Sequence, residues 1–69
     1  MATLEELRIE AELSLGALSR KAGVDIKTVR RALDGERVQQ MKAVAIVRAL
    51  SETLQRPLKL EDIDGLRYT

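Results

Sequence analysis

Apolar residues recur at intervals of three and four along most of this chain, which is the spacing of one face of an α-helix. The pattern predicts five helices, the first beginning at Thr3 and the others covering about 15–22, 26–34, 40–54 and 59–64. No stretch alternates between apolar and polar residues in the way that a half-buried β-strand does. We therefore expect an all-α fold in which the helix at 40–54, which has the widest apolar stripe, packs centrally.

Polar residues and glycines mark the ends of these predicted helices. Thr3 and Glu6 have the spacing of a capping box, in which each side chain accepts a hydrogen bond from the other residue's backbone N–H. Ser14 and Asp25 stand immediately before the second and third helices, where their oxygens can cap free N–H groups. Gly23 can adopt the positive φ that ends the second helix. The remaining ends are predicted at Gly35, at the Gln55–Pro57 break and at Gly65.

The stretch at about 15–34 contains two short helices that meet at a glycine turn. Val24, next to Gly23, is apolar and can fill the angle between the helices. The second helix places its apolar residues on one side, at Val29, Ala32 and Leu33. Its outward positions are hydrophilic and mostly basic: Lys27, Thr28, Arg30 and Arg31. A short helix, a glycine turn and a basic second helix are typical of a helix-turn-helix.

The run LSRKAGVDIKTV resembles the helix-turn-helix of the Cro/λ-repressor family of bacterial and phage regulators, also called the XRE family. The similarity extends roughly from Leu4 to Ile63. Gly23 and Val24 match the turn of the family, and Leu18 and Val29 match its core positions. Gly35-Glu36-Arg37 matches the loop after the recognition helix. The resemblance implies a compact five-helix, λ-repressor-like domain that binds double-stranded DNA sequence-specifically.

Four positions depart from the family pattern. Leu15 stands where the family usually has a Gln that touches a phosphate, and Ser19 replaces a usual Ala. Glu12 occupies a place where Gly commonly ends the first helix. Leu33 stands where many members carry a Glu paired with an Arg at the Arg8 position. We therefore expect no ion pair between positions 8 and 33 in this chain.

Residues that would contact DNA are predicted on the helix at 26–34 and around it. In this architecture the second helix of the motif enters the major groove. By the resemblance, the base-facing positions are Ile26, Lys27 and Arg31, with Thr28 and Arg30 close by. Arg and Lys can donate to guanine O6 and N7, and an isoleucine can pack on a thymine methyl group. Candidates for phosphate contact are Ser14, Arg20, Lys21, Arg37 and Lys42, although for Arg20 and Lys42 plain surface charge is the favoured interpretation.

The net charge of +1 hides an uneven distribution. Residues 20–48 hold eight Lys or Arg and three acidic residues, a balance of +5, while the parts before and after them are acidic, at −3 and −1. A basic patch on a nearly neutral protein is compatible with binding a polyanion through one face. Basic residues that merely solvate helix surfaces are the alternative, but the coincidence with the helix-turn-helix pattern favours DNA.

Other classes of function lack the residues they need. The 69-residue chain contains neither His nor Cys, so the usual nucleophile–base pairs, thiolate or imidazole metal sites and disulfides have no candidates. Isolated glycines form no phosphate-binding loop, and no apolar run approaches the roughly 20 residues of a membrane span. We expect a non-enzymatic cytoplasmic chain without metals or cofactors. We also expect one domain over 1–69, with a tail at 65–69 that can fray.

The predicted function is transcriptional regulation, with repression at a promoter as the simplest mechanism. The family often binds as a dimer, for which Leu66 and Tyr68 would be the exposed apolar candidates. One alternative is an antitoxin, which would bind both DNA and a toxin protein. Another is a helical protein-interaction module without DNA binding, which the departure at Leu15 favours and the clustered basic residues oppose.

Overall fold

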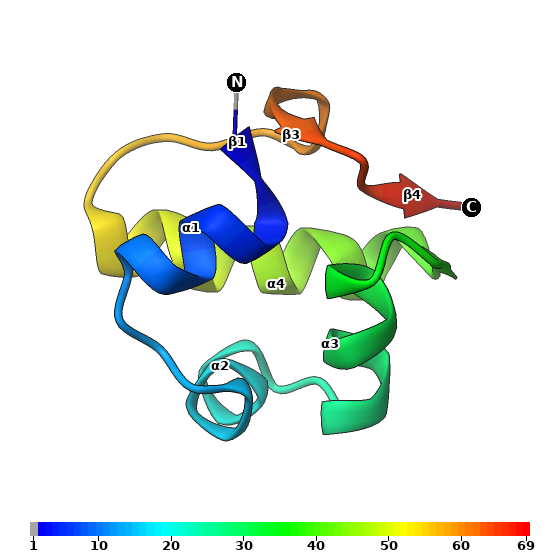
Figure 1. The fold of residues 1–69 in the computed structure, drawn as a ribbon, viewed down its shortest axis with the longest axis horizontal. Helices are drawn as coiled ribbons and strands as arrows, with labels where there is room; N and C mark the ends of the chain where they lie inside the picture. Colours follow the sequence, from blue (N-terminus) through cyan, green and yellow to red (C-terminus); the bar gives the residue numbers. More distant parts are fainter. Residues whose placement is uncertain (1) are drawn as a thin grey trace.

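The computed structural model describes residues 2–69 as a compact, mostly helical chain. Its four α-helices are α1 (Leu4–Glu10), α2 (Leu15–Ala22), α3 (Ile26–Leu33) and α4 (Gln40–Leu54). In Figure 1, α4 crosses the middle of the molecule, α1 lies beside it, and α2 and α3 lie below it. α2 packs on both α3 and α4, so the longest helix is central, as its apolar stripe predicts.

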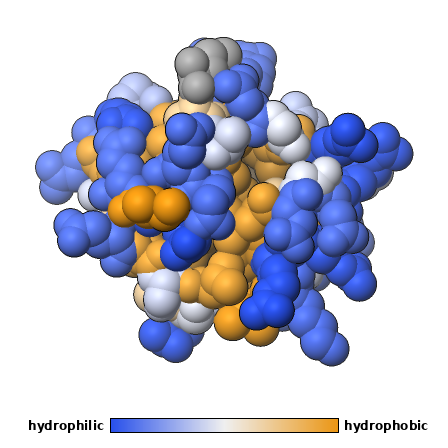
Figure 2. Space-filling view, viewed as in Figure 1, coloured by the Kyte–Doolittle hydropathy of each residue, from blue (hydrophilic) through white to orange (hydrophobic). Residues whose placement is uncertain are grey.

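The core is entirely aliphatic. Its largest fully buried side chains come from all four α-helices: Leu7, Leu18, Val29, Ile46 and Leu50. No polar or charged side chain is buried within residues 2–69. On the face seen in Figure 2, hydrophilic side chains cover α1 and α3, and apolar surface is visible between them. α4, at 15 residues, is shorter than a bilayer-spanning helix, and no other helix of this part of the chain qualifies as one.

The prediction of a fifth helix at about 59–64 is wrong. The segment contains a single 3₁₀ turn, η1 (Leu60–Asp62), in which Asp62 accepts a hydrogen bond from Lys59 N–H at 3.1 Å. Ile63 is already extended, at φ −101° and ψ 119°, and begins strand β3 (Ile63–Asp64). This strand pairs in parallel with β1 (Ala2–Thr3). A β-branched residue suits that extended backbone better than a helix.

A second pair of short strands holds the end of the chain. β4 (Arg67–Tyr68) pairs in parallel with β2 (Arg37–Val38), and Thr69 N–H donates to the Val38 carbonyl at 3.0 Å. Gln40 N–H, at the start of α4, donates to the Thr69 carbonyl at 3.2 Å. The tail that the sequence allowed to fray therefore carries a strand. The fold is mostly helical with two strand pairs, not purely α.

Two helices end in left-handed residues that are not glycine. Glu12 follows α1 at φ +57°, in the place where the family pattern has Gly, and Gln55 follows α4 at φ +54°. Near these ends, Arg56 donates to both carboxylate oxygens of Glu10, at 2.6 and 3.1 Å, and so links the ends of α1 and α4. Arg8 is also occupied locally, because it pairs with Glu5 and donates to the Leu13 carbonyl at 2.8 Å. Its guanidinium needs no partner at position 33.

Candidate functional site

The turn between α2 and α3 is fixed by local hydrogen bonds. Gly23 adopts φ +70°, and its N–H donates to the Ser19 carbonyl at 2.9 Å. Val24 is 7% exposed and fills the angle between the helices, as expected. The Ser19 hydroxyl donates to the Val24 carbonyl, a contact that sequence reasoning missed because it treated Ser19 only as a small residue. The hydroxyl thus ties the last turn of α2 to the entry of α3.

α3 is anchored by its apolar side and capped by Asp25. Val29 and Ala32 are buried and Leu33 is half-buried, so the opposite side of the helix faces outward. One carboxylate oxygen of Asp25 accepts from Thr28 N–H at 3.2 Å, and the other accepts from the Thr28 hydroxyl at 2.7 Å. Both groups of Thr28 are therefore used within the protein, and the predicted base contact of this hydroxyl would compete with the cap.

The remaining predicted base-contacting residues are all exposed on α3. They are Ile26, which is 46% exposed, Lys27, Arg30 and Arg31. Arg31 lies beside a hollow of about 380 Å³, which Ile26, Lys27 and Arg30 do not line. The lining residues come from α3, β2, the start of α4 and the end of the chain: Thr28, Arg31, Arg37, Val38, Gln39, Lys42 and Thr69. The structure thus brings Arg31 together with the predicted phosphate contacts Arg37 and Lys42.

The electrostatics of this face are predominantly positive. Lys42 Nζ lies 3.6 Å from an Asp25 carboxylate oxygen, so part of its charge is compensated. Hydrogen bonds from Thr28, together with the nearby charge of Lys42, hold the pKa of Asp25 below its usual range. Within the described part of the chain, Lys27, Arg30, Arg31 and Arg37 form no ion pair. Most of the positive charge on this face is therefore available to an external anion.

The predicted phosphate contacts on α2 are separate from this hollow. The Ser14 hydroxyl accepts from Ala17 N–H at 3.1 Å, which confirms its capping role. Arg20 and Lys21 are exposed in the last turn of α2. Arg20 Nη1 would lie 3.4 Å from a Cβ placed on Gly16, so this guanidinium folds back over the first turn of its own helix.

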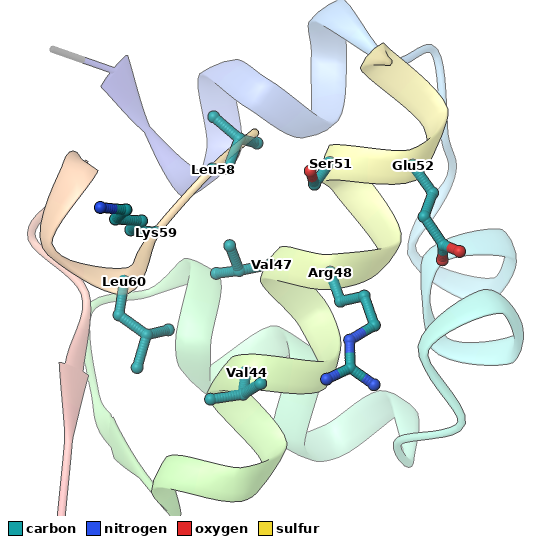
Figure 3. A pocket seen from close by; sticks show the side chains of 8 residues that line it. All are labelled: Val44, Val47, Arg48, Ser51, Glu52, Leu58, Lys59 and Leu60. Carbon is teal, nitrogen blue, oxygen red and sulfur yellow. The ribbon is translucent and has the colours of Figure 1, made fainter. Parts of the chain in front are cut away.

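The outer face of α4 carries a different kind of surface. A hollow of about 350 Å³ lies between α4 and the extended segment that follows Pro57. Val44 and Val47 lie on the side toward Leu58 and Leu60, while Arg48 and Glu52, which also line the hollow, point away from these leucines (Figure 3). Met41, at the start of the same helix, is 85% exposed. This surface is more apolar than the hollow beside α3 and offers no convergent set of cations.

The two residues predicted to form a dimer contact differ in exposure. Leu66 is half-buried and packs against the core, while Tyr68 lies in β4 and is 38% exposed. Leu66 is therefore a packing residue of the tail and not the exposed apolar candidate that the sequence indicated.

Comparisons of the chain with protein-family models, curated proteins and solved structures give no match. Across residues 2–69, no group of three or more acidic, His or Cys side chains is placed to hold a metal ion. The features that bear on function are therefore the geometry and charge of the α2–turn–α3 segment and of the hollow beside it.

Proposed function

We propose that this chain is a sequence-specific DNA-binding transcriptional regulator that presents α3 to the major groove. One observation carries the proposal: the exposed side of α3 holds Lys27, Arg30 and Arg31 without ion pairs, while its other side is anchored on α2 through the Gly23 turn. If the three basic side chains only kept the helix surface hydrated, they would not need to be held in a fixed orientation by the turn. The resemblance to the Cro/λ-repressor family and its helix-turn-helix gives the same interpretation. Repression by occupying a promoter in the cytoplasm is the simplest role.

The dimensions of α3 suit this role. An α-helix with its side chains is about 10–12 Å across, which matches the width of about 12 Å of the major groove of B-DNA. Lys27 lies in the first turn of α3, the part of a recognition helix that lies nearest the bases. A lysine there can donate to guanine O6 or N7, and Ile26 can contact a thymine methyl group. Arg20, Lys21, Arg37 and Lys42 would fix the register through phosphates.

The test begins with selection of bound sequences from a random pool of duplexes. Affinity for the selected duplex and for a scrambled one is then measured by fluorescence anisotropy at several salt concentrations. We expect binding to weaken steeply with salt, because each neutralised phosphate releases counterions. Lys27→Ala should cost about 1–3 kcal/mol on the selected duplex and little on the scrambled one.

Arg48→Ala is the matched control for that variant. It removes the same charge from an exposed position on α4, away from α3 and its hollow. If Arg48→Ala and Lys27→Ala reduced affinity for both duplexes equally, binding would be general attraction to a polyanion. Salt-independent affinity would argue against DNA as the ligand.

A second candidate function is binding of a partner protein, either alone or, as in an antitoxin, alongside DNA. The exposed Met41 and the apolar hollow between Val44 and Leu60 favour it, because exposed Met and aliphatic side chains are typical of interface cores. The selection experiment separates binding of a partner protein alone from DNA binding, with or without a protein partner. Failure to enrich any duplex would favour the protein-binding function without DNA.

A further inference from the structure

The hollow beside α3 differs from a general basic surface because its cations come from three separate elements. Arg31 comes from α3, Arg37 from β2 and Lys42 from the first turn of α4. We infer that this hollow is a discrete pocket for one phosphate group, and that Arg31 binds that phosphate and does not read a base. The identification of the phosphate as one of the DNA backbone rests on the proposed function.

The charge inside the hollow supports an anionic ligand. Arg31 and Arg37 form no ion pair within residues 2–69, and only Lys42 has an acidic neighbour, at 3.6 Å. Guanidinium groups prefer planar, paired acceptors, and a phosphate group offers such pairs to two guanidinium groups at once. No acidic side chain lines the hollow, since Asp25 is not one of its walls, and the main-chain oxygen of Thr69 at its edge already accepts a hydrogen bond from Gln40 N–H at 3.2 Å.

The start of α4 adds a second favourable contribution. Gln39, the residue before this helix, lines the hollow, and no side chain caps the helix there. The first turn of α4 also contains no acidic residue, and apart from the hydrogen bond from Gln40 N–H to the Thr69 carbonyl the positive end of this helix dipole is not compensated. Backbone N–H groups and cations on the same side of a pocket are a recurring arrangement for binding phosphate.

Arg31 differs from Lys27 in its relation to the hollow. Thr28 and Arg31, three residues apart, both line the hollow. Lys27 and Arg30 do not line it, although Lys27 lies only four residues before Arg31 and so on the adjoining part of the helix surface. The Thr28 hydroxyl already donates its hydrogen bond to Asp25, so Thr28 only forms a wall of the pocket. The hydrogen-bond donors to a bound phosphate are then the basic side chains. The lining of the hollow, and not the helix spacing, therefore distinguishes Arg31 from Lys27.

The pocket can be tested on the protein alone, without DNA. Inorganic phosphate is titrated at constant ionic strength, and amide chemical shifts are followed by NMR. We expect saturable 1:1 shifts centred on Thr28, Val38, Gln39 and Lys42. Arg31→Gln should weaken the phosphate affinity about tenfold, because one charge-assisted contact is lost. Arg48→Gln removes the same charge elsewhere and should leave the phosphate affinity unchanged. Shifts that never saturate, or equal effects of the two variants, would overturn the pocket.

A second measurement assigns the phosphate to DNA. Arg31→Gln should lower the affinity for selected and scrambled duplexes by the same factor and reduce the salt slope by about one. Lys27→Gln should instead reduce only the preference for the selected duplex. If Arg31→Gln relaxed the choice of base at one position and spared the scrambled duplex, Arg31 would be a base reader and the inference would be wrong.

The two experiments separate the two proposals. Saturable phosphate binding without binding of any duplex would support the pocket as a site for free phosphate groups and reject the DNA function. Binding of duplexes without the phosphate response would leave the DNA function intact and reject the pocket.

Discussion

The segment from Ser14 to Leu33 and the segment from Leu58 to Thr69 are stabilised by interactions of different range. In the first, each helix begins at a residue whose side chain bonds to the backbone three residues further on. The Ser14 hydroxyl accepts from Ala17 N–H at the start of α2, and the Asp25 carboxylate accepts from Thr28 N–H at the start of α3. In the second, the backbone follows strands that pair with residues far away, as β3 does with β1 and β4 with β2. The first segment presents the candidate site, and the second closes the core and one wall of the hollow beside α3.

This difference has a mechanical consequence for the site. The caps and the turn fix the junction of α2 and α3 through short-range contacts, while the buried Leu18 and Val29 anchor the two helices in the core. The terminal strands depend on burial of a few side chains, of which Ile63 is 5% exposed and Leu66 half-buried. Substitutions in the two segments should therefore differ both in size and in their dependence on conditions.

The largest effect is expected from Ile63→Ala in β3. Removing a buried isoleucine side chain to alanine typically costs about 2–5 kcal/mol of unfolding free energy, and Ile63→Val should cost about 0.5–1.5. Urea unfolding followed by circular dichroism measures both. Ile9→Ala serves as the control, because Ile9 is 61% exposed on α1 and its loss should lie within about 0.5 kcal/mol. Equal effects at Ile63 and Ile9 would mean that β3 does not contribute to the core.

An intermediate effect is expected at Gly23. A Cβ there would meet nothing within 4 Å, so a substitution costs only the left-handed backbone conformation. Gly23→Val should destabilise by about 1–3 kcal/mol, Gly23→Ala less, and Gly23→Asn least, because asparagine tolerates positive φ. Thermal unfolding of the three variants gives the order. A different order would mean that a clash, not backbone strain, determines the cost.

The smallest effects are expected at the two helix caps, and they should differ in pH dependence. Ser14→Ala should cost about 0.5–2 kcal/mol at every pH, since a hydroxyl does not titrate in the accessible range. The pKa of Asp25 is lowered from its ordinary value of 3.8, so the folded protein favours the ionised form. Its contribution is complete above that value and is lost as the pH falls through the folded pKa.

The penalty of Asp25→Ala should therefore shrink below about pH 4, while the penalty of Ser14→Ala stays constant. Unfolding curves of both variants and the unmodified chain, measured from neutral to acidic pH, make the comparison. A pH-independent penalty at Asp25 would show that its carboxylate does not act as the cap.

Short-range signals made most of the helical structure predictable. The ranges 15–22 and 40–54 are those observed for α2 and α4, and the predicted helix at 26–34 ends one residue earlier, at Leu33. The strands could not be predicted, because two residues are too few to show alternation and their partners lie elsewhere in the chain. The same limitation produced the wrong helix at 59–64, where the spacing of Leu60 and Ile63 fits a helix as well as a short turn.

For the candidate site, the exposure of its residues was predictable from the sequence but their grouping was not. The exposure of Lys27, Arg30 and Arg31 follows from the apolar spacing of Val29 and Ala32 on the same helix. The hollow that Arg31 shares with Arg37 depends on where β2 and β4 place the chain after α3, which no local pattern encodes.

The pairing of β1 with β3 also has a kinetic consequence. Joining Ala2 to Ile63 closes a loop that contains almost the entire chain, and the entropy lost on closure grows with the logarithm of loop length. Pairs of such separation form after local helices during folding. A weakened β1–β3 pair should therefore accelerate unfolding while leaving the refolding rate nearly unchanged. The lifetime of the folded chain, and not the speed at which it forms, would then be set by its two ends.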